Sequence, residues 1–285
     1  MSSEFLPATW RCIMTPPANG AWNMAVDEAI MHSIARKATL PTLRLYAWEP
    51  PCCSLGYAQS IEEIDLERLQ NLDWQIVRRP TGGRAILHTD ELTYAVIAPD
   101  FEPRMAGGVL ESYRVLSQAL LKALINMGVQ ASVQESSNSQ ANPNASMRPV
   151  KPKNPVCFEI PSSYEITIAG KKILGSAQAR KQGVVLQHGT LPLKGDITRL
   201  VQVLRFDSET DRQIASKRLL EKATTVQDCV THPIDWQQAA QTITSAFEQT
   251  LNLSLEYSDV TRDEYDLATQ LQIEKYASPD WTNRI

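Results

Sequence analysis

The sequence has little cysteine for its length and no long apolar run. Five of its 285 residues are cysteine, an odd number that leaves at least one thiol unpaired, so a disulfide framework is excluded. No segment approaches the roughly 18 consecutive apolar residues of a membrane-spanning helix, and the N-terminal residues lack the basic start and apolar stretch of a secretory signal. We therefore expect a cytoplasmic protein with reduced thiols that does not enter a membrane.

The sequence also lacks an excess of positive charge. Lys and Arg number 28 against 32 for Asp and Glu, which gives a formal net charge of −4. A mildly acidic chain is poorly suited to general binding of nucleic acid or of anionic lipid. The hydrophobic fraction of 43% and the charged fraction of 21% are typical of an ordinary globular protein.

Several common chemical motifs are absent. The sequence contains no G-x-x-x-x-G-K-[ST] and no G-x-G-x-x-G after a predicted strand, which argues against a P-loop and against a Rossmann dinucleotide site. It contains no C-x-x-C, and its four histidines are scattered singly, so no metal site is expected. A G-x-S-x-G segment is also missing, which argues against the usual serine hydrolase.

Apolar periodicity predicts both helices and strands. Apolar residues three and four apart predict helices over 19–36, 109–127, 197–204, 211–221, 234–251 and 262–273. Runs of alternating character predict strands over 43–48, 74–77, 84–87, 92–98, 164–168, 171–174 and 184–193. Hairpin-like strands with helices before and after them indicate an α+β fold, with a mainly antiparallel mixed sheet flanked by helices.

Two local features add detail to this fold. The turn Pro80-Thr81-Gly82-Gly83 separates two predicted strands, so we expect an antiparallel hairpin there. Residues 131–155 are rich in Ser, Asn, Pro and Gln and have no periodicity, which predicts a flexible loop. The composition leaves open whether this segment links two domains or is a mobile loop within one.

The first chemically dense segment is residues 78–88. It places three arginines and two glycines within seven positions, followed by His88. Glycines in a turn allow backbone N–H groups to approach a ligand closely. A charged hairpin turn with a solvated face is an equal alternative for this segment alone.

The second dense segment combines a thiol with two lysines. Cys157 precedes a predicted hairpin, and Lys171 and Lys172 follow its turn. Because neighbouring residues of a strand face opposite sides, only one lysine can point into a site. An ammonium group near a thiol favours the nucleophilic thiolate. The alternatives are a small buried hydrophobe for Cys157 and solvated charges on an edge strand for the lysines.

The two segments together, in this order, resemble the lipoate–protein ligase and octanoyltransferase family, whose members are cofactor transferases related to biotin–protein ligase. The shared blocks are Arg78-Arg79-x-Thr-Gly-Gly…His88 and Gly170-Lys-Lys-x-x-Gly-Ser-Ala, and the resemblance extends through Gln187-His188-Gly189-Thr190-Leu191. It implies a single catalytic domain over 1–285 with the fold of the biotin/lipoate protein ligases. The flexible loop over 131–155 and a helical C-terminal extension over 234–285 would belong to that domain.

Within the family, the sequence is most similar to the cysteine-dependent octanoyltransferases. The ATP-using ligases typically have a third glycine at the position of Arg84 and no cysteine at that of Cys157. The resemblance implies octanoyl transfer from acyl carrier protein, through a thioester on Cys157, to a lysine of a lipoyl domain such as glycine-cleavage H protein. No cofactor is required for this reaction, which belongs to lipoate biosynthesis.

Three alternatives are open. An ATP-dependent ligase would attach free lipoate to lipoyl domains and would need ATP. A related amidotransferase subgroup also uses a cysteine, but its surroundings differ from the Phe-x-x-Pro-Ser that follows Cys157 here. A catalytically silent binding module is the third alternative, and the presence of both Cys157 and Lys172 argues against it.

The resemblance also assigns roles to residues. Cys157 would be the nucleophile, and Lys172 would activate its thiolate and polarise the acyl carbonyl. The substrate pocket would be formed by Arg79, Thr81, Gly82, Gly83, Arg84, His88, Gly175, Ser176, Gly189 and Thr190. The remaining thiols, Cys12, Cys52, Cys53 and Cys229, would be packing residues. Because acyl carrier proteins and lipoyl domains are acidic, docking would rely on Arg78, Arg84, Lys171, Arg180 and Lys181.

Overall fold

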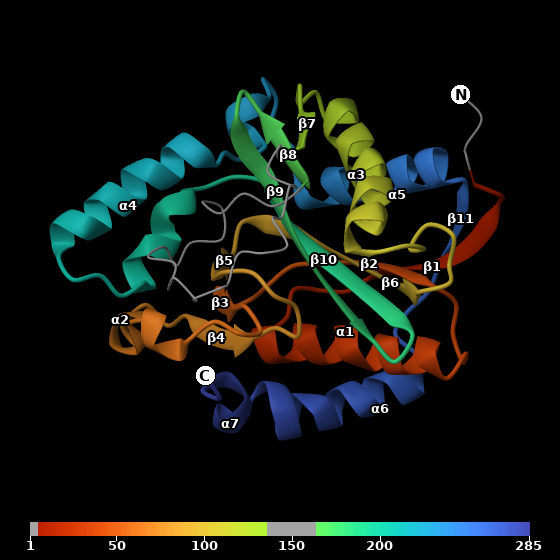
Figure 1. The fold of residues 1–285 in the computed structure, drawn as a ribbon, viewed down its shortest axis with the longest axis horizontal. Coiled ribbons are helices and arrows are strands. Elements are labelled where there is room, and N and C mark those ends of the chain that lie inside the picture. The colour runs from red at the N-terminus through yellow and green to blue at the C-terminus, as the bar shows by residue number, and fades with distance from the viewer. Residues whose placement is uncertain (1–4, 136–163) are drawn as a thin grey trace, which may run out of the picture.

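The computed structural model describes residues 5–135 and 164–285, which form two sheets with helices on both faces of the larger one (Figure 1). The larger sheet has eight strands within these residues, and all neighbouring pairs are antiparallel except the first two. The predicted α+β fold with a mainly antiparallel sheet is therefore confirmed. The strands, in spatial order, are β11 (Leu253–Tyr257), β1 (Ala8–Met14), β2 (Thr42–Tyr46), β6 (Glu91–Pro99), β10 (Val184–Pro192), β9 (Lys171–Lys181), β8 (Tyr164–Ile168) and β7 (Ser132–Glu135).

The larger sheet is buried on both faces because alternate residues of its central strands enter two different cores. Tyr94 of β6 packs in the core beneath α3 (Val109–Asn126) and α5 (Trp236–Leu251). Its neighbour Ala95 packs in the opposite core, against α1 (Gly20–Ala35). Figure 1 shows α3 and α5 on one side of the sheet and α1 on the other.

The smaller sheet contains β4 (Gln75–Arg78), β3 (Cys52–Leu55) and β5 (Ile86–His88), with β3 in the middle. Strand β3 is parallel to β4 and antiparallel to β5. The predicted hairpin across the turn 80–83 is therefore wrong, because β3 lies between the two strands that this turn connects. Strand β3 is hard to predict because it begins directly after Pro50-Pro51, and paired prolines indicate a break in a strand.

The predicted helices are confirmed within a few residues, and two of them have an irregular geometry. The segment predicted as a helix over 197–204 is the 3-10 helix η3 (Ile197–Val203), and α6 (Arg262–Leu271) continues as the π-helical turn η5 (Gln272–Tyr276). The helix predicted over 211–221 is α4 (Glu209–Lys222). The sequence did not predict α2 (Leu66–Asn71), α7 (Pro279–Thr282), η1 (Ile61–Glu63) or η4 (Gln227–Cys229).

Strands β1, β3, β7 and β11 were also missed. Strand β7 lies inside the segment predicted to be a flexible loop over 131–155, so that prediction is wrong for residues 132–135. These four residues pair with β8, from the next described stretch of chain. The rest of the predicted loop lies outside the described residues.

A buried ion pair ties α6 to strand β1. The Arg11 guanidinium donates to both carboxylate oxygens of Glu264, at 3.1 and 2.7 Å, and the Glu264 side chain is only 1% exposed. Glu264 also forms a capping box with Thr261 at the start of α6. Burial alone would raise the pKa of Glu264, but hydrogen bonds from Arg11 and Thr261 hold it below its ordinary value. Helix α6 in turn packs along α1.

We predict that Glu264→Gln lowers the free energy of unfolding by about 3 kcal/mol or more, because it leaves the buried Arg11 guanidinium without a counter-charge. The matched control is Arg262→Gln, which breaks the exposed pair with Asp266 on the same helix and is expected to cost below about 0.5 kcal/mol. Urea unfolding at pH 7 measures both. Equal losses for the two variants would show that the buried pair does not anchor α6.

Candidate active site

A cavity with an empty volume of about 420 Å³ lies between the smaller sheet, α1 and strands β9 and β10; we call it the central cavity. Its wall joins the two dense sequence segments, which are about ninety residues apart along the chain. The predicted residues that line it are Arg79, Gly83, His88, Gly175, Ser176, Gly189 and Thr190. Much of the remaining wall is apolar or aromatic and comes from Met24, Tyr46, Trp48, Ile86 and Ala177.

Thr81 joins the turn after β4 to the larger sheet. Its Oγ1 lies 2.7 Å from Nε2 of His188 on β10, and its carbonyl accepts from the Tyr57 N–H. The residue after His188 on β10 must be glycine, because a Cβ on Gly189 would lie 2.6 Å from the carbonyl oxygen of Gly175. Thr81 therefore holds the wall of the central cavity together without lining it.

A chain of hydrogen bonds that runs from Trp48 to Glu91 orients His88. Trp48 Nε1 can only donate, and it donates to Thr93 Oγ1 at 2.8 Å, so the Thr93 hydroxyl donates to Glu91 Oε1 at 2.6 Å. Glu91 also accepts from Nδ1 of His88 at 2.6 Å, and Nε2 of His88 lies 2.7 Å from the Ser54 hydroxyl oxygen. The Trp48 ring also stacks on the imidazole, with 3.9 Å between centroids. These contacts fix the orientation of the His88 ring.

His188 has a similar arrangement on the opposite wall. Its Nδ1 lies 3.3 Å from Asp27, whose carboxylate also accepts from Arg44 at 2.7 Å and from the Tyr46 hydroxyl at 3.0 Å. Burial lowers the pKa of His188, whereas Arg44 and His188 hold the pKa of Asp27 below its ordinary value despite its burial. We infer that His188 is neutral near pH 7 and accepts from Thr81. A neutral imidazole at the cavity wall suits an uncharged ligand.

Three residues of the predicted pocket have other structural roles. The buried Arg79 guanidinium lines the central cavity, but it also donates to the carbonyls of Ser54, Gly82 and Arg84. The Arg84 side chain pairs with Glu63 at 2.9 Å and is not part of the cavity wall. Gly82 contributes its carbonyl to Arg79 and is also outside the wall.

The basic residues predicted to dock an acidic partner differ in exposure. Arg78 is fully buried and donates to the carbonyls of Gly56 and Thr282. Its predicted role in docking is therefore wrong, and it instead anchors the C-terminal residues to the smaller sheet. Arg180 and Lys181, at the end of β9, are exposed.

A bulge in strand β9 determines which way the Lys172 side chain points. The β8–β9 pairing shifts by one residue, so Ile173 is an extra residue, and both Ile173 and Leu174 pack in the core beneath α3. Such a bulge re-aims the neighbouring side chain. The Lys172 ammonium lies 2.9 Å from Glu165 Oε1 and its side chain is 8% exposed. Lys171 is only half-buried, so the two lysines face different surroundings, as predicted.

Cys157 lies outside the described residues, and the other four cysteines are packing residues as predicted. Cys12, Cys52 and Cys53 are buried, and Cys229 packs at the edge of the core beneath α3. Burial raises the pKa of Cys12 and of Cys53 to about 12. Within residues 5–135 and 164–285 there is no cluster of three side chains able to hold a metal ion.

The polar residues of the site that were not predicted include Asp27, Ser54, Glu91, Thr93, Glu165 and His188. Asp27 had a signal in the sequence, because it precedes Ile30 and Ile34 by three and seven residues and therefore lies on the apolar stripe of α1. A carboxylate at such a position is rarely buried without a partner. Ser54 was missed together with β3.

No helix in the described part of the chain has the length and apolar character needed to cross a membrane.

The sequence matches known proteins over most of its length. The family model for the lipoyl protein ligase A/B catalytic domain matches residues 19–248. Octanoyltransferase LipM of Kyrpidia tusciae is 39% identical over 277 residues, which cover 97% of this chain and 99% of the relative. Octanoyltransferase LipM of Bacillus subtilis is 36% identical over 279 residues, which cover 96% of this chain and 97% of the relative.

Solved structures share the fold. A bi-partite lipoate protein ligase from Thermoplasma acidophilum, solved in a study of an archaeal lipoylation system and its E2 lipoyl domain, has a TM-score of 0.78 and 24% identity and covers 96% of both chains. A lipoate-protein ligase A bound with ATP has a TM-score of 0.77 and 23% identity and covers 97% of this chain and 99% of its own. The structure therefore has the expected fold, and by sequence the chain belongs to the lipoyl protein ligase A/B catalytic-domain family.

Proposed function

We propose that this protein is an octanoyltransferase of lipoate biosynthesis. The donor would be octanoyl-acyl carrier protein, and the acceptor would be a lysine of a lipoyl domain such as that of glycine-cleavage H protein. Near-full-length similarity to octanoyltransferases supports the reaction class. The observation that carries the proposal is the central cavity, whose wall is built from both family motifs.

The central cavity suits an alkyl chain with one polar end. Met24, Tyr46, Trp48 and Ile86 provide apolar surface, and each buried methylene of a ligand contributes about 0.8 kcal/mol. The two histidines of the cavity are held by fixed hydrogen bonds, so they do not need to reorganise when the ligand binds.

The proposed reaction proceeds in two steps. In the first, the Cys157 thiolate forms a bond to the acyl carbon, and the thiolate of the donor leaves and takes up a proton. In the second, the acceptor amine attacks the same carbon, loses a proton and forms an amide, while the Cys157 thiolate leaves. Lys172, oriented by Glu165, supplies positive charge for the thiolate and for the developing oxyanion.

This route needs no nucleotide. Exchange of one thioester for another is nearly balanced in free energy, and conversion of a thioester to an amide is favourable. The alternative ligase reaction would start from a free carboxylic acid, which needs activation by ATP before an amine can displace it.

Docking of acidic partners would rely on local charge, since the protein itself is acidic overall. Arg180 and Lys181 are exposed at the end of β9, the strand that also lines the central cavity. Interactions of this kind are weak and are screened by salt.

We predict that octanoyl passes from octanoyl-carrier protein to a lipoyl domain without ATP, and that Cys157→Ala abolishes the transfer because no thioester can form. Intact mass spectrometry of the acceptor measures the transfer. Cys229→Ala is the matched control and is expected to remain active. Transfer only after addition of ATP and free octanoate would identify a ligase instead.

We also predict that Lys172→Met slows acylation of the protein by about 10²–10³-fold, because it removes the charge that stabilises the oxyanion. Lys171→Met removes the same charge from the adjacent, half-buried position and is expected to have little effect. Single-turnover mass spectrometry measures the rates, and melting temperatures verify that both variants are folded. Equal rates in two folded variants would remove Lys172 from the mechanism.

A further inference from the structure

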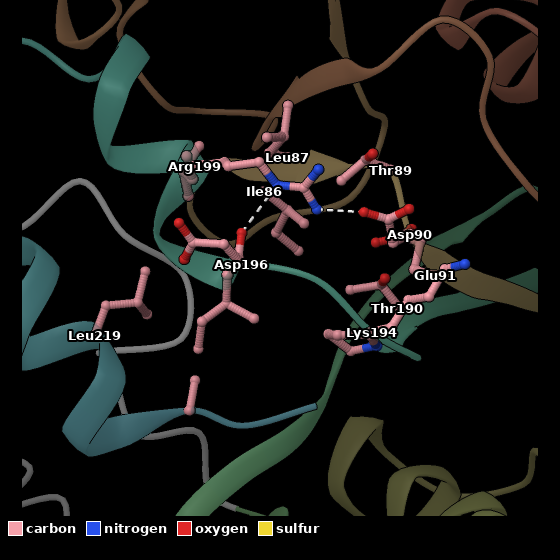
Figure 2. A pocket seen from close by; sticks show the side chains of 14 residues that line it. Ile86, Leu87, Thr89, Asp90, Glu91, Thr190, Lys194, Asp196, Arg199 and Leu219 are labelled. Carbon is pink, nitrogen blue, oxygen red and sulfur yellow. Dashed lines mark hydrogen bonds and ion pairs between the residues drawn. The ribbon is translucent and has the colours of Figure 1, made fainter. Parts of the chain in front are cut away.

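A second cavity, with an empty volume of about 530 Å³, adjoins the central cavity; we call it the outer cavity (Figure 2). Ile86 and Thr190 line both cavities and therefore lie where the two meet. Strand β5, the end of β10, η3 and α4 form its walls. Most of its lining is apolar and includes Leu87, Ile197, Leu200 and Leu219.

Thr190 has a buried hydroxyl group that the protein does not use. The residue is 1% exposed, and its Oγ1 has no hydrogen-bond partner among the described residues. An unpaired buried hydroxyl is destabilising, and buried polar groups normally have a partner. Because Thr190 lies where the cavities meet, a ligand that extends through both would place a polar group beside this hydroxyl.

The lining of the outer cavity contains charged groups of both signs, three carboxylates and two basic side chains. Arg199 donates to Asp90 at 2.5 Å and to the carbonyl of Asp196 at 3.0 Å (Figure 2). The Asp196 carboxylate caps η3, and Glu91 pairs with the imidazole of His88. Lys194 is exposed and forms no ion pair within the described residues. The Lys194 ammonium is therefore available to an anionic group at the rim.

The outer cavity also lies close to the predicted reaction centre. Ala223 forms part of its wall and pairs as an isolated bridge with Lys172. The N–H of the next residue, Thr224, donates to the Lys172 carbonyl at 3.1 Å. The wall of the outer cavity is thus joined to the backbone of Lys172, although the Lys172 side chain does not line it.

We propose that the outer cavity binds the thiol arm of the acyl donor, a largely uncharged amide-containing chain that ends in a phosphate. The acyl chain occupies the central cavity, the Thr190 hydroxyl donates to the thioester carbonyl between the two, and Lys194 faces the phosphate. The proposal rests on the proposed function. The acceptor lysine fits the outer cavity less well, because its short arm fills little of the volume.

The test compares acylation of the whole protein by three octanoyl thioesters, those of 4′-phosphopantetheine, pantetheine and N-acetylcysteamine, with no acceptor present. Thr190→Val is expected to slow acylation by all three roughly 10-fold, the upper range for loss of one hydrogen bond. Its melting temperature should stay the same or rise, since the hydroxyl has no partner in the protein. Thr190→Ser keeps the hydroxyl and should acylate faster than Thr190→Val. A rate for Thr190→Val equal to that of the unaltered protein would overturn the role of Thr190.

Two further variants test the arm itself. Lys194→Gln should lower kcat/KM for the phosphopantetheine thioester relative to the pantetheine thioester, whereas Lys217→Gln, on an exposed part of α4, should leave that ratio unchanged. Leu87→Trp, which narrows the outer cavity from its partly exposed side, should reduce the preference for pantetheine over N-acetylcysteamine. If Lys194→Gln does not change the ratio of kcat/KM for the phosphopantetheine and pantetheine thioesters, and Leu87→Trp does not change the preference for pantetheine over N-acetylcysteamine, the arm binds elsewhere.

The remaining outcomes separate this proposal from the proposed function. Normal acylation of Leu87→Trp with slow transfer to a lipoyl domain would assign the outer cavity to the acceptor and overturn the proposal. Acylation of the unaltered protein by N-acetylcysteamine thioester, without any preference for longer arms, would support the octanoyltransferase and reject the arm site. No acylation by any of the three thioesters or by octanoyl-carrier protein would reject both.

Discussion

The site depends on the hydrogen bond between Thr81 and His188, because it joins the smaller sheet to the larger one across the central cavity. His188 can accept this bond only if its Nδ1 carries the proton, and Asp27 holds that proton in place. Asp27 is in turn held by Arg44 on β2. One buried network thus links α1, the central strands and the glycine-rich turn, and it places two distant motifs of the sequence in one wall.

Periodicity was sufficient to predict the long elements but not their pairing. Helices α1 and α3 have continuous apolar stripes, and their bounds were predicted within a few residues. Strand β3 is four residues long, follows two prolines and pairs with β4 and β5 on either side, so nothing local indicates that it separates them. Tertiary pairing of this kind decides topology and leaves little trace in the sequence.

The pocket residues were predicted from family resemblance rather than from their spacing. Some of them line the central cavity in the structure, and others lie outside it. His88, Gly175 and Thr190 line the central cavity, whereas Arg84 pairs with Glu63 outside it. The carboxylates that fix the histidines could not be assigned from the sequence, since their partners lie on other elements. The same holds for the unpaired hydroxyl of Thr190, which is visible only once burial and hydrogen bonds are known.

The central claim is that the octanoyl group passes through a thioester on Cys157. Its most direct test locates the group on the protein after one turnover with octanoyl-carrier protein in the absence of acceptor, by peptide mapping with mass spectrometry. We expect an octanoyl group on the peptide that contains Cys157, and its release by hydroxylamine. Octanoyl on another cysteine or on Lys172, or transfer to the acceptor with no acylated protein at any time, would contradict it.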